Sequence, residues 1–71
     1  SPARSIAKAK PAADPAKAAR LRASGLMALN NGRAAEAVDL LRNAAAQDPG
    51  NGAIQADLAR AIRVRGSVEG Q

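Results

Sequence analysis

The chain has 71 residues, a formal net charge of +5 and a hydrophobic share of 46%, yet it contains no Phe, Tyr, Trp, Cys or His. These absences exclude disulfide frameworks and zinc–thiolate sites, remove the commonest general base, and leave no aromatic platform for single-stranded nucleic acid. The length allows one domain at most, and we expect neither an enzyme nor a cofactor or metal site.

Residues 1–13 are rich in Ala, Lys and Pro, and Pro11 would interrupt a helix running through them. We therefore expect a flexible or partly helical basic arm. The arm lacks the apolar core of a signal peptide. No apolar run in the chain approaches the roughly 20 residues that a membrane span needs.

A first helix is predicted over residues 15–30. Asp14 is a favourable N-cap, and Pro15 suits the first helical position, where a backbone N–H is not needed. Gly32 suits the left-handed conformation with which many helices end. The larger apolar residues of this helix are Leu21, Leu26, Met27 and Leu29.

A second helix is predicted over residues 33–47, where Ala37, Leu41 and Ala44 recur at three- and four-residue spacing. Glu36 lies in its first turn, which suits the helix dipole. The dipeptide Asp48-Pro49 ends this helix, because the residue before proline avoids the helical conformation.

A third helix is predicted over residues 52–65, with Asn51 as its cap and Gly66 as its end. Its apolar stripe consists of Ile54, Leu58, Ala59 and Ile62. Residues 67–71 then form a disordered tail, and no alternating run predicts a strand. Residues 14–66 are thus expected to form one all-α module.

The positive charge lies at the two ends of the chain. Residues 1–22 carry a net +5, residues 23–59 a net −2, and residues 60–71 a net +2. One interpretation is attraction to nucleic acid or an anionic lipid surface. The other is a solvated surface on which the C-terminal arginines complement a helix dipole. We favour the second, because no groove-reading motif accompanies the charge.

An internal repeat appears when the sequence is shifted by 34 residues. Asp14-Pro15 then falls on Asp48-Pro49, Gly25 on Ala59, and Gly32 on Gly66. The cap, the small residue in mid-helix and the glycine after the helix therefore recur together at one spacing.

The segment from Ala18 to Asn51 resembles a tetratricopeptide repeat (TPR). The residues that carry the resemblance are Leu21-x2-Ser24-Gly25-x2-Ala28, Glu36-Ala37-x3-Leu41, Ala44 and Asp48-Pro49. A partial second repeat from Gly52 matches at Leu58-Ala59-x2-Ile62 and Gly66. The chain departs from the family where Leu21 replaces a Trp, Ala28 a Tyr and Ser24 a Leu.

The resemblance implies antiparallel helix-turn-helix units that pack through small residues. The implied packing residues are Leu21, Gly25, Ala28, Ala37, Leu41, Ala44, Pro49, Leu58, Ala59 and Ile62. It also implies a non-catalytic scaffold or adaptor module, in which the first helices of the repeats line a groove for a protein or peptide. The implied groove residues are Arg22, Leu26, Leu29, Asn30, Asp57, Arg60, Arg63 and Val64, with Ala19, Ala23, Ala53 and Ala56 between them.

Two interpretations of Leu26 and Leu29 remain open. They anchor an apolar residue of the partner while Arg22, Arg60 and Arg63 attract its acidic groups, or they are covered by residues 1–13 or a second copy of the chain. One TPR subgroup clamps a terminal carboxylate with a Lys/Asn set. Leu26 and Asp57 occupy the positions of the two Asn residues, which argues against that subgroup.

The resemblance covers one and a half repeats, whereas about three are normally needed for a stable stack. We expect neighbouring repeats, self-association or a partner to complete it. The bias to Ala, Arg and Gly and the Pro/Ala/Lys-rich arm suggest part of a larger bacterial protein, such as a secretion, pilus or polysaccharide-export assembly, in cytoplasm or periplasm. The alternative is a basic helical protein that binds nucleic acid or an anionic surface, although nucleic acid is not the expected partner.

Overall fold

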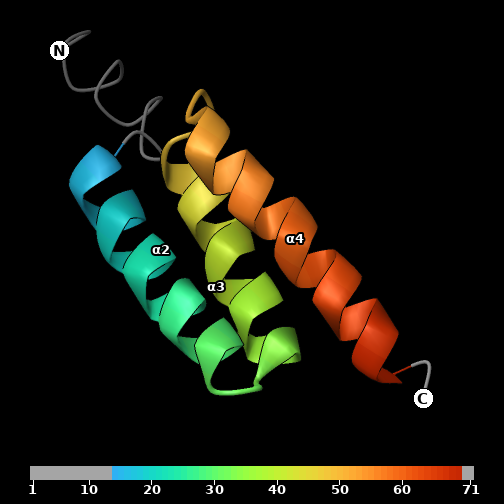
Figure 1. Ribbon diagram of the computed structural model, residues 1–71. Helices are drawn as coiled ribbons and strands as arrows, with labels where there is room; N and C mark the ends of the chain where they lie inside the picture. The colour runs from blue at the N-terminus through green and yellow to red at the C-terminus, as the bar shows by residue number, and fades with distance from the viewer. Residues whose placement is uncertain (1–13, 70–71) are drawn as a thin grey trace, which may run out of the picture.

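The computed structural model describes residues 14–69, which form three α-helices. Helix α2 spans Pro15–Asn30, α3 spans Ala34–Gln47, and α4 spans Gly52–Glu69. Successive helices run antiparallel, and α3 packs against both α2 and α4, which themselves barely touch (Figure 1). The predicted all-α helix-turn-helix architecture is confirmed. The arm predicted for residues 1–13 lies outside the described residues.

Helix α2 begins as its sequence predicts. The Asp14 carboxylate accepts a hydrogen bond from the Lys17 backbone N–H at 3.0 Å, and Pro15 occupies the first helical position. The Asp14 N–H donates to the Gln47 carbonyl at 2.9 Å. This last bond ties the start of α2 to the end of α3, so the helix cap also fixes the hairpin.

The turn between α2 and α3 is a Schellman motif. The Arg33 N–H donates to the Ala28 carbonyl at 2.8 Å, and the Gly32 N–H donates to the Leu29 carbonyl at 3.1 Å. Gly32 has a φ of +82°, a left-handed conformation that glycine adopts without steric cost. The predicted role of Gly32 is confirmed.

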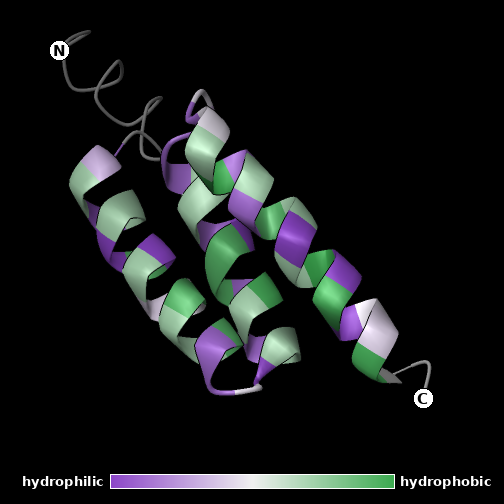
Figure 2. Cartoon of the chain, viewed as in Figure 1, coloured by the Kyte–Doolittle hydropathy of each residue, from purple (hydrophilic) through white to green (hydrophobic). Residues whose placement is uncertain are grey.

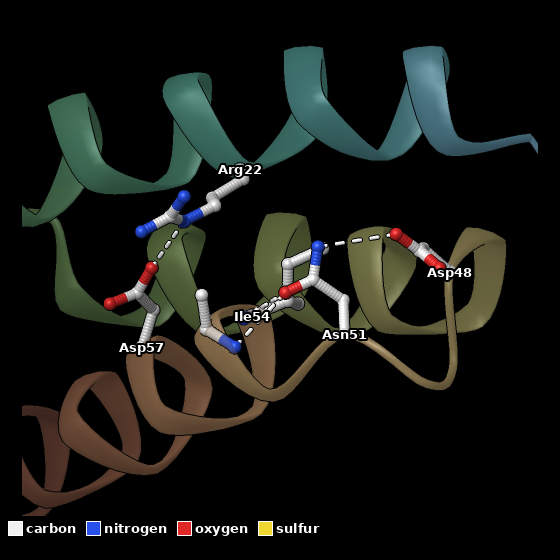
Figure 3. Close-up of polar contacts among 6 residues, drawn as sticks. Arg22, Asp48, Asn51, Ile54 and Asp57 are labelled. Atoms are coloured by element: carbon white, nitrogen blue, oxygen red, sulfur yellow. Dashed lines mark hydrogen bonds and ion pairs between the residues drawn. The ribbon is translucent and has the colours of Figure 1, made fainter.

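Asn51 caps α4, also as predicted. Its Oδ1 accepts hydrogen bonds from the N–H groups of Ala53 at 3.0 Å and Ile54 at 3.2 Å. Its Nδ2 donates to the Asp48 carboxylate at 3.2 Å (Figure 3). A single side chain therefore connects the end of α3 to the first turn of α4.

The predicted end of the third helix is wrong. Helix α4 continues through Gly66 to Glu69, so residues 67–69 are helical, and Arg63 and Arg65 do not lie in its last turn. Among the described residues only Gly32 has a positive φ, so Gly66 takes an ordinary helical conformation. A glycine inside a helix costs only about 1 kcal/mol relative to Ala. This cost weakens the helix at residue 66 but is too small to end it. Residues 70–71 lie outside the described part.

The core consists of two clusters along α3. One joins Ala28, Ala37, Val38, Leu41 and Ala61, and the other joins Ala18, Ala44 and Ile54. Figure 2 shows hydrophobic colouring on α3 where it lies between its neighbours. Helix α3 thus supplies a buried side chain to both interfaces, whereas α2 and α4 each bury one face.

Gly25 lies where α2 packs tightly against α3. A Cβ placed on this buried residue would lie 2.8 Å from Cγ of Leu41, whose side chain is itself fully buried. Because core side chains are close-packed, Leu41 has no free space into which it can move. The sequence predicts that Gly25 allows α2 to approach the next helix closely. The contact between Gly25 and Leu41 of α3 is the place where this happens.

Three residues predicted to pack are exposed, namely Pro49, Ala59 and Ile62. Helix α4 instead turns Ile54 and Ala61 toward α3. Ala59 and Ile62 lie on a flank of α4 that no other helix within residues 14–69 covers. Pro49 acts in the connection between helices, where it ends α3 rather than packing.

We predict that Gly25→Ala lowers the free energy of unfolding, whereas Gly66→Ala raises it. The new methyl group at residue 25 overpacks Leu41 at a cost of about 1–3 kcal/mol, which exceeds the gain of about 1 kcal/mol in helix propensity. At Gly66 nothing lies within 4 Å of the added Cβ, so only the gain remains. Urea unfolding followed by circular dichroism measures both variants, and equal stabilisation by the two would contradict the close contact.

We also predict that Asn51→Ala destabilises the chain by about 1 kcal/mol, because the first turn of α4 loses its cap. The matched control is Asn43→Ala, at an exposed position within α3, which should be neutral or stabilising by a few tenths of a kcal/mol. Thermal unfolding of both variants under one condition provides the comparison. A loss of the same size in both would show that the cap contributes nothing specific.

Candidate functional site

The face shared by α2 and α4 contains most of the residues predicted to line a groove. We call it the α2–α4 face and define it by Arg22, Leu26, Asp57, Arg60 and Val64. Arg22, Leu26, Asp57 and Val64 are half-buried, and Arg60 is exposed. The α2–α4 face therefore combines apolar surface near α3 with cationic groups at its edge.

An ion pair joins the two helices across this face. Nε of Arg22 donates to Oδ2 of Asp57 at 2.5 Å, and the side chains are 40% and 17% exposed respectively (Figure 3). The pair spans 35 positions in the sequence. Arg22 is therefore already neutralised within the chain, which revises the expectation that it attracts acidic groups of a partner.

Both members of this ion pair are among the predicted groove residues, but the sequence did not predict that they pair. The signal in the sequence is their spacing of 35 residues, one more than the 34-residue repeat. This spacing places the two opposite charges at neighbouring positions on α2 and α4, the equivalent helices of the two repeats. Charge alone was insufficient, because Arg20 and Lys17 are also basic residues of α2. Only the packing of α2 and α4 on α3 brings the Arg22 guanidinium to Asp57.

The two leucines of the predicted groove differ in their surroundings. Leu29 is half-buried and packs against the core cluster that contains Ala28, Leu41 and Ala61. Leu26 is also half-buried but belongs to neither core cluster. Leu26 is consequently the better candidate for an apolar anchor, because the side chain of Leu29 is partly used in packing against the core.

The remaining predicted groove residues are mostly exposed. Asn30 follows Leu29 at the end of α2, and Arg63 lies on α4 after Arg60. The small residues between them are also exposed: Ala19, Ala23, Ala53 and Ala56. Because these alanine side chains are short, they project little from the helices. The backbone of a bound segment is therefore able to approach α2 and α4 closely.

Two surface hollows lie elsewhere, beside the turn between α2 and α3. One is lined by Gly32, Arg33, Ala34, Ala35, Glu36, Arg65 and Val68. The other is lined by Ser24, Met27, Ala28, Asn31, Arg33, Glu36 and Leu40. Both are open to solvent and neither holds a group of catalytic residues, so we do not place the candidate site in them.

The described residues contain neither a metal-binding cluster nor a membrane-spanning helix. Within residues 14–69 there is no cluster of three or more His, Cys, Asp or Glu side chains placed to hold a metal ion. In the same range, no helix has both the length and the hydropathy that crossing a membrane requires. The features that remain are surfaces suited to contact with other molecules.

Comparison with known families identifies the architecture. The family model for the tetratricopeptide repeat matches residues 28–69, which is more than half of the chain. The chain belongs to the tetratricopeptide repeat family. No curated protein and no solved structure matches it. The predicted resemblance is thereby confirmed.

The matched range starts at Ala28, later than the Ala18 at which the sequence register placed the first repeat. It covers the end of α2, all of α3 and all of α4. TPR modules are typically non-catalytic, and the family implies protein partners. In this TPR chain, the family match therefore centres on α3, α4 and the connection between them.

We predict that a double-mutant cycle on Arg22→Ala and Asp57→Ala gives a coupling free energy of about 0.5–1 kcal/mol. The value is limited by the 40% exposure of the Arg22 side chain and should fall with added salt. The control pair is Arg33 and Glu36, separated by 3.7 Å with both side chains more than half exposed, for which about 0–0.3 kcal/mol is expected. Urea unfolding at low and high ionic strength measures both cycles, and indistinguishable couplings would contradict a specific interhelical pair.

Proposed function

We propose that this TPR chain is a protein–protein interaction module whose α2–α4 face binds an extended peptide or a helix of a partner protein. The observation that carries the proposal is the half-buried Leu26 beside a row of exposed alanines on α2 and α4. An apolar anchor in a low surface is the usual core of a protein-binding site. Membership of the TPR family supports a role of this kind.

The charges around Leu26 indicate the chemistry of the partner. Because Arg22 is paired with Asp57, the remaining positive charge of the α2–α4 face comes from Arg60, and Arg63 adds to it from the neighbouring turn of α4. Rim charges of one sign attract a partner of the opposite sign and mainly raise the rate of association. We propose that the bound segment has an apolar side chain next to acidic groups.

The biological setting is a further part of the proposal. The bias toward Ala, Arg and Gly suggests a GC-rich genome, and the Pro/Ala/Lys-rich residues 1–13 resemble the linkers that precede such repeats in cell-envelope assembly proteins. We propose that the module is part of a larger bacterial protein of a cell-envelope assembly, such as one for secretion, pilus formation or polysaccharide export. Neighbouring repeats or self-association would then complete the stack that this TPR segment begins.

We predict that Leu26→Asp abolishes partner capture, whereas Met27→Asp leaves it unchanged. Burial of a leucine anchor contributes enough that its replacement should lower capture at least about tenfold. Met27 is the adjacent residue, 64% exposed and outside the α2–α4 face, so it controls for the added charge. The experiment is affinity capture from a nuclease-treated bacterial lysate with quantitative mass spectrometry, after circular dichroism has shown equal helicity of the variants.

Equal loss in both variants would contradict the assignment of the face. The alternative of nucleic-acid binding, which the net charge of +5 favours, gives a different result in the same experiment. Capture would then disappear on nuclease treatment, and binding to DNA would fall steeply with salt, by nearly one logarithmic unit per phosphate contact.

A further inference from the structure

The ion pair between Arg22 and Asp57 uses only part of the hydrogen-bonding capacity of the two side chains. Nε of Arg22 donates to Oδ2 of Asp57 at 2.5 Å, and no further hydrogen bond within residues 14–69 involves either side chain. A guanidinium carries additional N–H donors on its Nη atoms, and a carboxylate accepts through both of its oxygens. The Nη atoms of Arg22 and Oδ1 of Asp57 are therefore donors and an acceptor that the fold itself does not use.

These unused groups are accessible from the α2–α4 face. The Arg22 side chain is 40% exposed and the Asp57 side chain is 17% exposed. In Figure 3 the guanidinium of Arg22 and the second oxygen of Asp57 both extend away from Asn51. Leu26 follows Arg22 by one turn of α2 and lies on the same side of that helix. A partner segment that contacts Leu26 therefore also lies within reach of the ion pair.

The two charges of the pair restrict what is able to bind beside them. A carboxylate that approaches the Nη atoms of Arg22 comes close to the negative charge of Asp57. An ammonium group that approaches Oδ1 of Asp57 likewise comes close to the positive charge of Arg22. Desolvation on a partly buried surface also costs a charged group more free energy than a neutral polar group. A neutral group that both accepts and donates hydrogen bonds therefore suits the pair best.

The side-chain carboxamide of Gln or Asn has this character. Its oxygen accepts hydrogen bonds and its nitrogen donates them, and the two atoms lie side by side at the end of the side chain. Nη of Arg22 is then able to donate to the carboxamide oxygen, while the carboxamide nitrogen donates to Oδ1 of Asp57. The N–H and C=O of one trans peptide unit point in opposite directions, so the backbone of a bound segment does not supply both atoms at one place.

We propose that the Arg22–Asp57 pair determines the specificity of the α2–α4 face by binding a Gln or Asn side chain of an extended partner segment. This role rests on the proposed function, since it takes a segment as bound to this face. One turn of α-helix places Leu26 about 5.4 Å from Arg22 along α2. Alternate side chains of an extended segment lie about 6.6 Å apart, so the carboxamide belongs to the residue next but one to the apolar residue that contacts Leu26.

The test uses the whole chain and a set of short peptides with acidic residues at both ends. The peptides are capped by acetyl and N-methylamide groups, so that the caps add no primary carboxamide. Each has Leu at the next position but one on both sides of a variable residue, which makes the direction of binding irrelevant. The variable residue is Gln, Glu, Lys or Ala. Heteronuclear NMR of the chain measures binding at about 0.15 M ionic strength, where a screening length of about 8 Å limits the effect of the net charge.

We expect the Gln peptide to bind at least about tenfold more tightly than the Ala peptide, because it makes two additional hydrogen bonds. It should also bind more tightly than the Glu and Lys peptides, since each of those brings a charge next to a like charge of the pair. The chemical shifts that change most should belong to Arg22, Leu26 and Asp57.

Variants of the pair should change the order of affinities and not only weaken binding. Asp57→Asn leaves Arg22 as an unpaired cation, so the Glu peptide should become the tightest ligand. Arg22→Gln leaves Asp57 as an unpaired anion, so the Lys peptide should become the tightest ligand. The control Arg42→Gln removes a positive charge from an exposed position of α3 and should leave each dissociation constant within about twofold. Circular dichroism confirms the helicity of each variant before titration.

Different results overturn the role of the ion pair and the proposed function. Equal binding of the Gln and Ala peptides, or tightest binding of the Glu or Lys peptide to the unmodified chain, would overturn the role of the pair. An unchanged order of affinities in Asp57→Asn would do the same. If Leu26→Asp abolishes the binding in these cases, the α2–α4 face itself stands. Absence of binding by every peptide, or binding that Leu26→Asp leaves unchanged, would instead contradict the α2–α4 face and both proposals with it.

Discussion

The close contact between Gly25 and Leu41 is the packing constraint on which the rest of the structure depends. The chain has no aromatic residue, so its core must be filled by helices that approach one another closely. Leu41 is fully buried, and burying one leucine contributes about 1.5–3 kcal/mol. Because a core of this size rarely supplies more than about 3–5 kcal/mol in total, the position of this side chain determines whether α2 and α3 form a stable hairpin.

Helix α3 differs from its neighbours because it packs against two helices, α2 and α4. Its Leu41 lies against Gly25 of α2. It also contributes Val38 and Ala44 to the two core clusters that contain Ala61 and Ile54 of α4. The only ion pair between α2 and α4 in the described residues, Arg22 with Asp57, closes the arrangement on one side. Helices α2 and α4 are therefore positioned by α3 and have faces left for binding.

The unburied faces of α2 and α4 are the surfaces that this chain offers for contact with other molecules. The α2–α4 face offers Leu26 among small residues, and α4 also leaves Ile62 exposed beside Ala59. Both surfaces are edged by arginines whose charge is not neutralised by Asp57. Membership of the TPR family implies a role in protein–protein interaction, and the proposed site on this chain rests on the shape and charge of its helix faces.

Local sequence determined the positions of the helices. Asp14, Pro15, Gly32 and Asn51 act through hydrogen bonds and backbone angles within a few residues, and the family resemblance rested on residues at fixed spacing. Tertiary structure decided which side of each helix is buried and which charges meet. Gly32 takes a left-handed conformation because α3 folds back onto α2, whereas Gly66 stays helical because no described element packs back there. The pairing of Arg22 with Asp57 and the exposure of Ile62 likewise follow from contacts between distant segments, which helical periodicity does not specify.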